Sequence, residues 1–104
     1  MGSPYRIQFL ASAARQLEAI PINAQGAVAA AIDGLAREPR PDGAKLLSGS
    51  GNERIWRIAV NAYRVLYEVE DARLVILVVR VADRREVYNP TTLKRLLKQI
   101  RSSR

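Results

Sequence analysis

Residues 54–81, RIWRIAVNAYRVLYEVEDARLVILVVRV, predict three strands in quick succession and set the architecture of the chain. Apolar and polar residues alternate over 54–60 and again over 63–70, a pattern typical of strands with one buried face. Residues 74–81 are almost all β-branched or Leu, as expected for a central strand that is covered on both faces. Because short turns separate the three strands, the stretch predicts an antiparallel meander.

The residues before this meander predict one strand and two helices. Residues 5–9 alternate and predict a short first strand. Ser12 is expected to cap a helix that stops at Pro21, and a second helix is predicted over about 23–37. We expect the two helices to form an antiparallel hairpin that lies on one face of the sheet.

The remaining segments complete the expected order β-α-α-β-β-β-α. Residues 37–52 predict a loop, anchored within it by residues 45–47, and residues 90–101 predict a basic C-terminal helix. This order predicts an α+β domain in which the N-terminal strand and helical hairpin pack on an antiparallel sheet. We expect one domain over 1–104, with residues 1–3 as an expression remnant.

The amino-acid composition restricts the chemistry open to this chain. The 104 residues include no cysteine, which excludes disulfides and thiolate sites, and no histidine, the commonest acid–base catalyst and metal ligand. We therefore expect no metal and no cofactor. Because there is neither an apolar run near ~20 residues nor a signal-peptide pattern, we expect a soluble cytoplasmic protein without a membrane partner.

The positive charge is concentrated in the last quarter of the sequence. The formal net charge is +7, and residues 80–104 contribute eight basic and two acidic side chains. Such an excess favours a polyanionic partner, and RNA is one. The alternative is a solvated basic tail that only keeps a small protein soluble.

Strand alternation assigns two arginines to a common surface. Arg57 alternates with the apolar residues of its strand, and Arg64 does so in the next strand. Since the apolar sets should pack under the helices, both guanidinium groups are expected on the opposite face of the sheet. Guanidinium groups there suit phosphate oxygens. The alternative is cross-strand pairing with Glu68 or Glu70.

Residues 45–88, KLLSGSGNERIWRIAVNAYRVLYEVEDARLVILVVRVADRREVY, resemble the RelE branch of the RelE/ParE toxin superfamily. The likeness extends over residues 4–88, and the YRVLYEV and RREVY segments are specific in combination. The resemblance implies a toxin of a bacterial toxin–antitoxin system that cleaves mRNA in the ribosomal A site and binds a cognate antitoxin. A ParE-like inhibitor of DNA gyrase without nuclease activity is the alternative, and an RNA-binding module without activity is a third.

The same resemblance implies a set of catalytic residues. By position in the family pattern they are Arg57, Arg64, Arg84 and Tyr88. The implied reaction is attack of a ribose 2′-OH on the adjacent phosphate. Arg57 and Arg64 would hold the phosphate. Arg84 would stabilise or protonate the leaving oxygen, and Tyr88 would orient the nucleotide or stack on it.

Two positions depart from the family pattern and leave the general base open. Ala59 stands where relatives often carry a second lysine, and Asp83 stands where many have histidine. Arginine, with a pKa above ~12, is a poor base at neutral pH. Lys45 and Glu68 are the candidates, although Lys45 is expected to face solvent and Glu68 to pair with Arg57.

Further cations are expected to contact RNA outside the catalytic set. They are Lys45, Arg85, Lys94, Arg95 and Lys98. The last three belong to the predicted helix at 90–101, whose leucines form an apolar stripe. We expect this helix to dock on the core by that stripe and to turn its basic face toward RNA.

Overall fold

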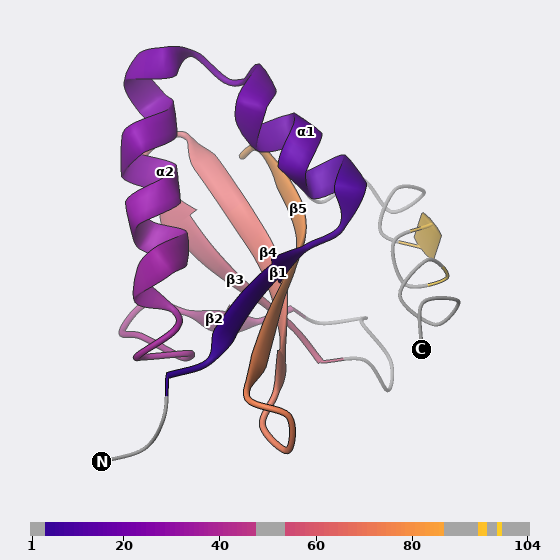
Figure 1. Ribbon diagram of the computed structural model, residues 1–104. Helices are drawn as coiled ribbons and strands as arrows, with labels where there is room; N and C mark the ends of the chain where they lie inside the picture. Colours follow the sequence, from indigo (N-terminus) through magenta and orange to yellow (C-terminus); the bar gives the residue numbers. More distant parts are fainter. Residues whose placement is uncertain (1–3, 48–53, 87–93, 96–97, 99–104) are drawn as a thin grey trace.

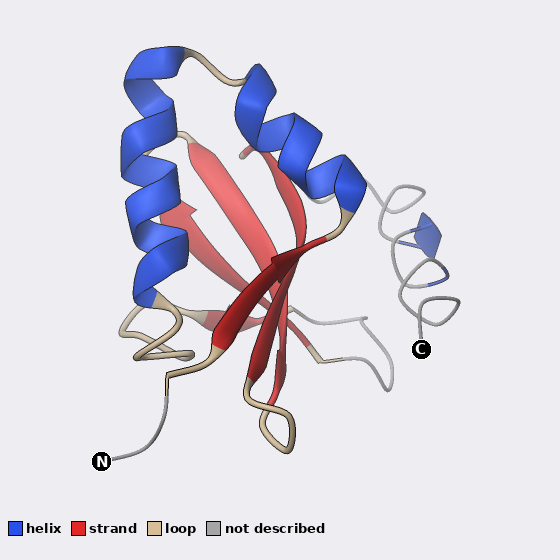
Figure 2. Ribbon diagram, in the orientation of Figure 1, coloured by secondary structure: helices blue, strands red, loops and turns tan. Residues whose placement is uncertain are grey.

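The computed structural model describes residues 4–47, 54–86, 94–95 and 98. Two helices, α1 (Ala11–Ala19) and α2 (Ile22–Gly34), cover one face of a five-stranded sheet (Figure 1, Figure 2). Its strands are β1 (Arg6–Phe9), β2 (Lys45–Leu46), β3 (Ile55–Val60), β4 (Tyr63–Glu70) and β5 (Val75–Asp83). The order across the sheet is β1-β5-β4-β3-β2. The predicted α+β fold is confirmed.

The sheet is mixed rather than wholly antiparallel, which corrects the prediction. β1 runs parallel to β5, with Arg6 opposite Val75 and Phe9 opposite Val78, while β4 runs antiparallel to β5. β1 and β5 lie far apart in the sequence. The alternation within each strand indicates which side chains share a face, but not whether the two strands run parallel or antiparallel. β5 is an interior strand, between β1 and β4, and most of its apolar side chains are buried.

Helix α1 begins two residues earlier than expected, and the predicted Ser12 cap is wrong. Leu10 occupies the N-cap position and provides no side-chain cap. Its backbone N–H donates to the carbonyl of Val78, so the strand pairing of β1 with β5 extends to this residue. Strand therefore passes directly into helix. Ser12 lies inside α1, and its hydroxyl oxygen is buried without a hydrogen-bond partner among residues 4–47 and 54–86.

The junction between the helices is closed by a side chain of α2. Gln25 Nε2 donates to the carbonyls of Glu18 (3.0 Å) and Ile20 (2.9 Å), which α1 leaves without a helical donor at its C-terminus. Pro21 follows and prevents α1 from continuing. Helix α2 is shorter than the predicted 23–37 because the chain turns after Gly34.

The core lies between the helices and the face of β3, β4 and β5 that they cover. Val28 and Ile32 of α2 and Leu35 just after it are almost fully buried. Across β3 and β4 the register pairs their counterparts on this face: Trp56 with Tyr67, Ile58 with Val65, and Val60 with Tyr63. The Tyr67 hydroxyl donates to the Pro39 carbonyl (2.7 Å), which ties the segment after α2 to the sheet.

A short strand, β2, forms inside the stretch predicted as a loop. Lys45 lies opposite Arg57 and Leu46 opposite Trp56, and the Leu47 N–H donates to the Ile55 carbonyl (2.7 Å). The predicted anchor at residues 45–47 is therefore an edge strand. Strand β2 places Lys45 beside Arg57.

Four side chains from distant segments meet at one end of the sheet and form what we call the Asp71 cluster. Arg40 pairs with Asp71 (Nη2–Oδ2 2.8 Å), and the Tyr5 hydroxyl donates to Asp71 Oδ1 (2.7 Å). The Arg40 guanidinium carbon lies 5.4 Å from the centroid of the Trp56 ring. These hydrogen bonds lower the pKa of Asp71, with Arg40 as the main cause and Tyr5 next.

No helix within the described ranges is both long and apolar enough to pass through a lipid bilayer.

Candidate functional site

The sheet face turned away from the helices collects cations from four strands. One row across the sheet aligns Lys45 of β2, Arg57 of β3, Leu66 of β4 and Arg80 of β5. Because directly opposed residues share a face, these side chains project from the same side. The neighbouring row places Arg64 between Ala59 and Ala82. We call the surface formed by Lys45, Arg57, Arg64 and Arg80 the basic face.

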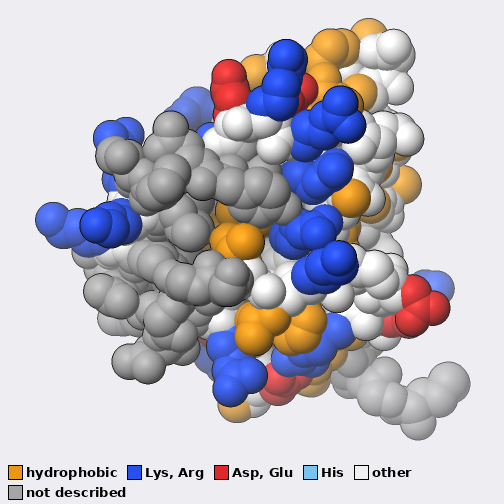
Figure 3. All heavy atoms as spheres, turned by 180° about the vertical axis from the view of Figure 1, so that it is seen from behind, with side chains coloured by type: hydrophobic (Ala, Val, Ile, Leu, Met, Phe, Trp, Pro, Cys, Tyr) orange, Lys and Arg blue, Asp and Glu red, His pale blue; other side chains and the backbone are white. Residues whose placement is uncertain are grey.

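The space-filling view shows this concentration of charge directly. Seen from behind, Lys and Arg side chains form a column on the surface opposite the helices (Figure 3). A column of cations focuses a positive potential and attracts a polyanion along its length. The surface therefore suits a nucleic-acid backbone.

Within the described residues, Arg57 and Arg64 occupy this face without an ion pair to a carboxylate. Both side chains are half-buried, and no ion pair joins either of them to a carboxylate of residues 4–47 or 54–86. Arg64 Nη1 instead donates to the carbonyls of Asn61 (3.0 Å) and Tyr63 (2.9 Å), at the β3–β4 turn. Carbonyls hold the guanidinium group in place and leave its full positive charge available to an anion.

The turn that follows β5 brings two more arginines to the same end of the sheet. The Arg84 N–H donates to the Ala62 carbonyl (2.9 Å), so this turn meets the β3–β4 turn that holds Arg64. Arg85 donates to Asp83 Oδ1 through its backbone N–H (2.8 Å) and through Nε (3.3 Å). Both Arg84 and Arg85 are exposed. Segments that are distant in the chain thus contribute cations to one region.

Asp83, the last residue of β5, is a weak base. The hydrogen bond from the Arg85 backbone is the main cause that lowers the pKa of the Asp83 carboxyl, and the Arg85 side chain and the charge of Arg84 act in the same direction. A carboxylate with a lowered pKa holds a proton poorly at neutral pH. Its evident role is to fix the Arg85 backbone.

Sequence alternation missed Arg80 as a member of the site. The pairing of β4 with β5 shifts by one residue between Leu66 and Tyr67, which leaves Val79 as a bulge. Without that extra residue, Arg80 would fall on the helix-covered face with Val78. With it, Arg80 lies opposite Leu66 on the basic face. Bulges often re-aim a side chain in this way beside functional sites.

Glu70 pairs away from the basic face, whereas Glu68 lies on it. Glu70 accepts from Arg73 (Oε2–Nη1 2.9 Å) across the β4–β5 turn. Glu68 lies opposite Ile55 on the basic face, one row beyond Arg57, and its side chain is buried, with the residue 4% exposed. Because solvent screens a buried carboxylate only weakly, its Coulomb interaction with charges inside the site is strong.

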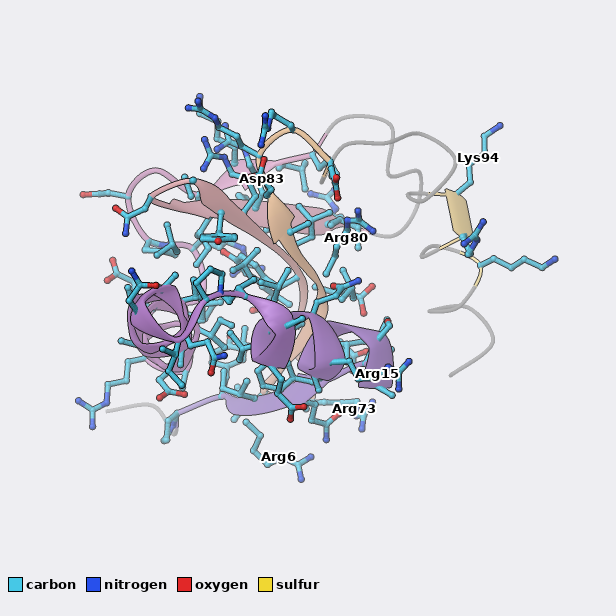
Figure 4. The ribbon with its side chains drawn as sticks, turned by 90° about the horizontal axis from the view of Figure 1, so that it is seen from above. Arg6, Arg15, Arg73, Arg80, Asp83 and Lys94 are labelled. Atoms are coloured by element: carbon cyan, nitrogen blue, oxygen red, sulfur yellow. The ribbon has the colours of Figure 1, made fainter. Side chains whose placement is uncertain are left out.

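The remaining predicted site residues are Lys94, Arg95 and Lys98 near the C-terminus, Tyr88, and Lys45 on β2. Lys94, Arg95 and Lys98 are helical and exposed, and Lys94 points away from the sheet in the view from above (Figure 4). Tyr88 lies outside the described residues, so its expected place beside the arginines stays a prediction. Lys45 is exposed at the edge of the basic face.

A hollow of about 340 Å³ lies between α2, the segment that follows it and β3. Leu35 and Ile58 form part of its apolar lining, and Glu38 and Asp42 contribute carboxylates. Negative side chains repel phosphate. The hollow is therefore unsuited to the polyanion that the basic face attracts.

Comparison with known proteins identifies the relatives of this chain. The family model described as the ParE toxin of the type II toxin–antitoxin system parDE matches residues 7–88. The toxin–antitoxin complex RelBE2 from Mycobacterium tuberculosis is similar in structure, with 28% identity, a TM-score of 0.68, and coverage of 78% of this chain and 99% of that chain. No curated protein matches.

Two further structures share the fold at lower identity. The RelE–RelB complex from Pyrococcus horikoshii OT3 has 24% identity and a TM-score of 0.69, covering 81% of this chain and 99% of that chain. The isolated Escherichia coli RelE toxin has 23% identity and a TM-score of 0.62, covering 88% and 98%.

Proposed function

The chain belongs to the ParE toxin family of the RelE/ParE superfamily and is a RelE-like toxin of a type II toxin–antitoxin system, and from this premise we propose that it is a ribosome-dependent endoribonuclease. The observation that carries the proposal is the basic face. Arg57 and Arg64 lie on one side of the sheet, without carboxylate partners in the described chain, and the turn that bears Arg84 docks beside Arg64.

The proposed reaction is cleavage of mRNA by its own ribose. The 2′-hydroxyl loses its proton to water as its oxygen attacks the adjacent phosphorus. The bond from phosphorus to the 5′-oxygen breaks, this oxygen takes up a proton from water, and a 2′,3′-cyclic phosphate and a 5′-hydroxyl result. Arg57 and Arg64 hold the phosphate and neutralise the charge that develops on it. Arg84 stabilises the leaving oxygen, and Tyr88 orients the nucleotide.

A site built of arginines lacks a strong general base near neutral pH. Arginine stays protonated, and the lowered pKa of Asp83 keeps that carboxylate a weak acceptor. The rate enhancement is therefore expected to come from charge neutralisation and from the ribosome, which holds mRNA in a reactive geometry. This explains why cleavage should depend on the ribosome.

Primer extension on mRNA in programmed ribosomes tests the assignment. Wild-type toxin should cleave within the A-site codon, and Arg64→Ala should cleave at least about a hundredfold more slowly because a phosphate ligand is lost. Arg73→Ala is the matched control, since Arg73 pairs with Glu70 at the β4–β5 turn. Equal cleavage by wild type and Arg64→Ala rejects the site.

Inhibition of DNA gyrase is a second candidate function. The matched family model is that of the ParE toxin, and Ala59 stands where RelE-like proteins often have lysine. A supercoiling assay with purified gyrase separates the two activities. Loss of supercoiling without loss of mRNA favours the gyrase inhibitor.

An antitoxin is the proposed partner of the toxin. The M. tuberculosis and P. horikoshii structures are toxin–antitoxin complexes, and this chain carries a net charge of +7 with cations exposed on the basic face. An acidic segment that folds on binding would neutralise that face and exclude mRNA. Co-purification with the product of the adjacent gene, weakened by high salt, tests this partner.

A further inference from the structure

Arg80 reaches from the basic face to the turn after β5 with its side chain. Its Nη2 donates to the Glu86 carbonyl (3.1 Å), six residues further along the chain. Glu86 in turn donates its N–H to the Asp83 carbonyl (3.0 Å) and closes the turn. The side chain therefore links the far end of the turn to the middle of β5.

The other bonds of this turn act at its beginning. The Arg84 N–H donates to the Ala62 carbonyl, and Asp83 Oδ1 accepts from Arg85. Within the residues that the structure describes, Arg80 provides the hydrogen bond from a sheet side chain to the last residue of the turn. Tyr88 follows two residues later in the sequence.

Arg80 holds this position at a cost in stability. Its Nε is buried and has no hydrogen-bond partner among residues 4–47 and 54–86, and burial lowers the pKa of its guanidinium group while the charge of Glu86 acts in the opposite direction. A bulge at Val79 is needed to bring the side chain to this face. Natural proteins accept such local costs mainly at functional sites.

We propose that Arg80 is a positioning residue of the nuclease site, which holds the turn at residues 83–86 so that Arg84 faces the substrate phosphate. The inference rests on the proposed endoribonuclease function. Arg80 acts through the Glu86 carbonyl, and the bulge at Val79 is the device that aims it. A 1 Å displacement of a catalytic group can cost a large factor in rate, so a loose turn should slow cleavage.

Amide exchange measures the positioning independently of any activity. In Arg80→Met, the Arg84 and Glu86 amides should exchange about tenfold faster because the turn loses its anchor. The Val81 amide, which donates to Gln16 Oε1 on α1, reports whether β5 itself has loosened. Its exchange should stay unchanged. Arg6→Met is the matched control, since Arg6 lies on the other side of the molecule from Arg80 in Figure 4.

A double-mutant cycle with Arg84 tests the connection to catalysis. Single-turnover cleavage on programmed ribosomes should fall about tenfold in Arg80→Met, with the half-saturating toxin concentration nearly unchanged. In an Arg84→Ala background, Arg80→Met should cost less than about a further twofold, because both changes remove the same contribution. Arg80→Gln serves in the same cycle if Arg80→Met does not fold.

Three results would overturn parts of this picture in distinguishable ways. Losses that multiply in the double variant would mean that Arg80 acts independently of Arg84. Unchanged exchange at Arg84 and Glu86 would mean that Arg80 does not hold the turn. Absence of cleavage by wild-type toxin would remove the proposed function, and the exchange measurement would still decide whether Arg80 anchors the turn.

Discussion

Arginine plays opposite parts in two regions of this molecule. In the Asp71 cluster, Arg40 pairs with a carboxylate at 2.8 Å and lies over the Trp56 ring. On the basic face, Arg64 donates to two neutral carbonyls, and neither Arg64 nor Arg57 has an ion pair in the described part of the chain. In the Asp71 cluster, a carboxylate of the chain neutralises the cation. On the basic face, the positive charges are available to an external anion.

The difference distinguishes charged side chains that stabilise the fold from those that bind an external anion. A cation that is already paired gains little from a phosphate, because it must first give up its partner. Cations gathered without partners repel each other and destabilise the fold slightly, and they bind an external anion strongly. The Asp71 cluster should therefore contribute to stability alone, and the basic face mainly to binding and cleavage.

The largest expected effect comes from giving Arg64 the kind of partner that Arg40 already has. Ala59 lies directly opposite Arg64 and is exposed. Ala59→Glu should place a carboxylate about 5 Å from Arg64 at the level of the Cβ atoms. Single-turnover cleavage should then fall about a hundredfold, because the phosphate loses a neutralising group and meets a negative charge.

Ala59→Gln provides the control for that change, with the same size and no charge. It should retain cleavage within about threefold of wild type, since exposed substitutions away from special features are usually mild. Thermal unfolding should show both variants close to wild type in stability. Equal loss of cleavage in both variants would point to steric obstruction and contradict the electrostatic explanation.

Sequence patterns predicted the fold class and the shared face of two arginines for the same reason. β3 and β4 keep a strict period of two around Arg57 and Arg64, so alternation fixes which side each residue faces. The direction of β1 could not be predicted, because its pairing with β5 is long-range. Ser12 looked like a helix cap, but the strand hydrogen bond at Leu10 decided where α1 begins.

Alternation could not place Arg80, because a bulge interrupts the period of two in β5. Val78 and Val79 precede it in a run of aliphatic residues, and such a run contains no sign of where an extra residue is inserted. An arginine inside a buried strand was the signal available. Lys45 was named from the sequence, but its place opposite Arg57 could not be predicted, since it depends on a strand of two residues.

The next largest effect is expected at Tyr67, where a substitution should lower stability and leave cleavage intact. Tyr67→Phe removes the hydroxyl that donates to the Pro39 carbonyl and should destabilise the fold by about 1–2 kcal/mol, measured by urea unfolding. Cleavage should stay within about twofold of wild type, because Tyr67 is on the covered face. A large loss of activity at unchanged stability would contradict this separation.

The same residue predicts a loss of stability in alkali. Burial raises the pKa of Tyr67 from 10.0 to about 12. The folded state therefore favours the protonated phenol, and its contribution is complete below the unfolded pKa and lost as pH rises through about 12. The stability difference between wild type and Tyr67→Phe should shrink over this range.

Arg40→Met should have a smaller effect, because the pair with Asp71 is exposed to solvent. Loss of the ion pair and of the contact with the Trp56 ring should cost about 0.5–1 kcal/mol in thermal unfolding. Cleavage should be unchanged. Arg73→Met, at the nearby pair with Glu70, controls for removal of one positive charge from this end of the molecule.

The smallest effect is the pH dependence of the Asp71 cluster. Hydrogen bonds from Arg40 and Tyr5 lower the pKa of Asp71 below its usual 3.8 in the folded state. Its contribution is therefore complete above the unfolded pKa and disappears as pH falls through the lower, folded value. Asp71→Asn should be less stable than wild type by about a few tenths of a kcal/mol at pH 7, and the difference should vanish in acid.

Because Asp83 titrates in both proteins, comparing wild type with Asp71→Asn cancels its contribution. A difference that grew in acid would mean that Asp71 does not draw its stability from Arg40, and the contrast between a paired and an unpaired arginine would lose its structural half.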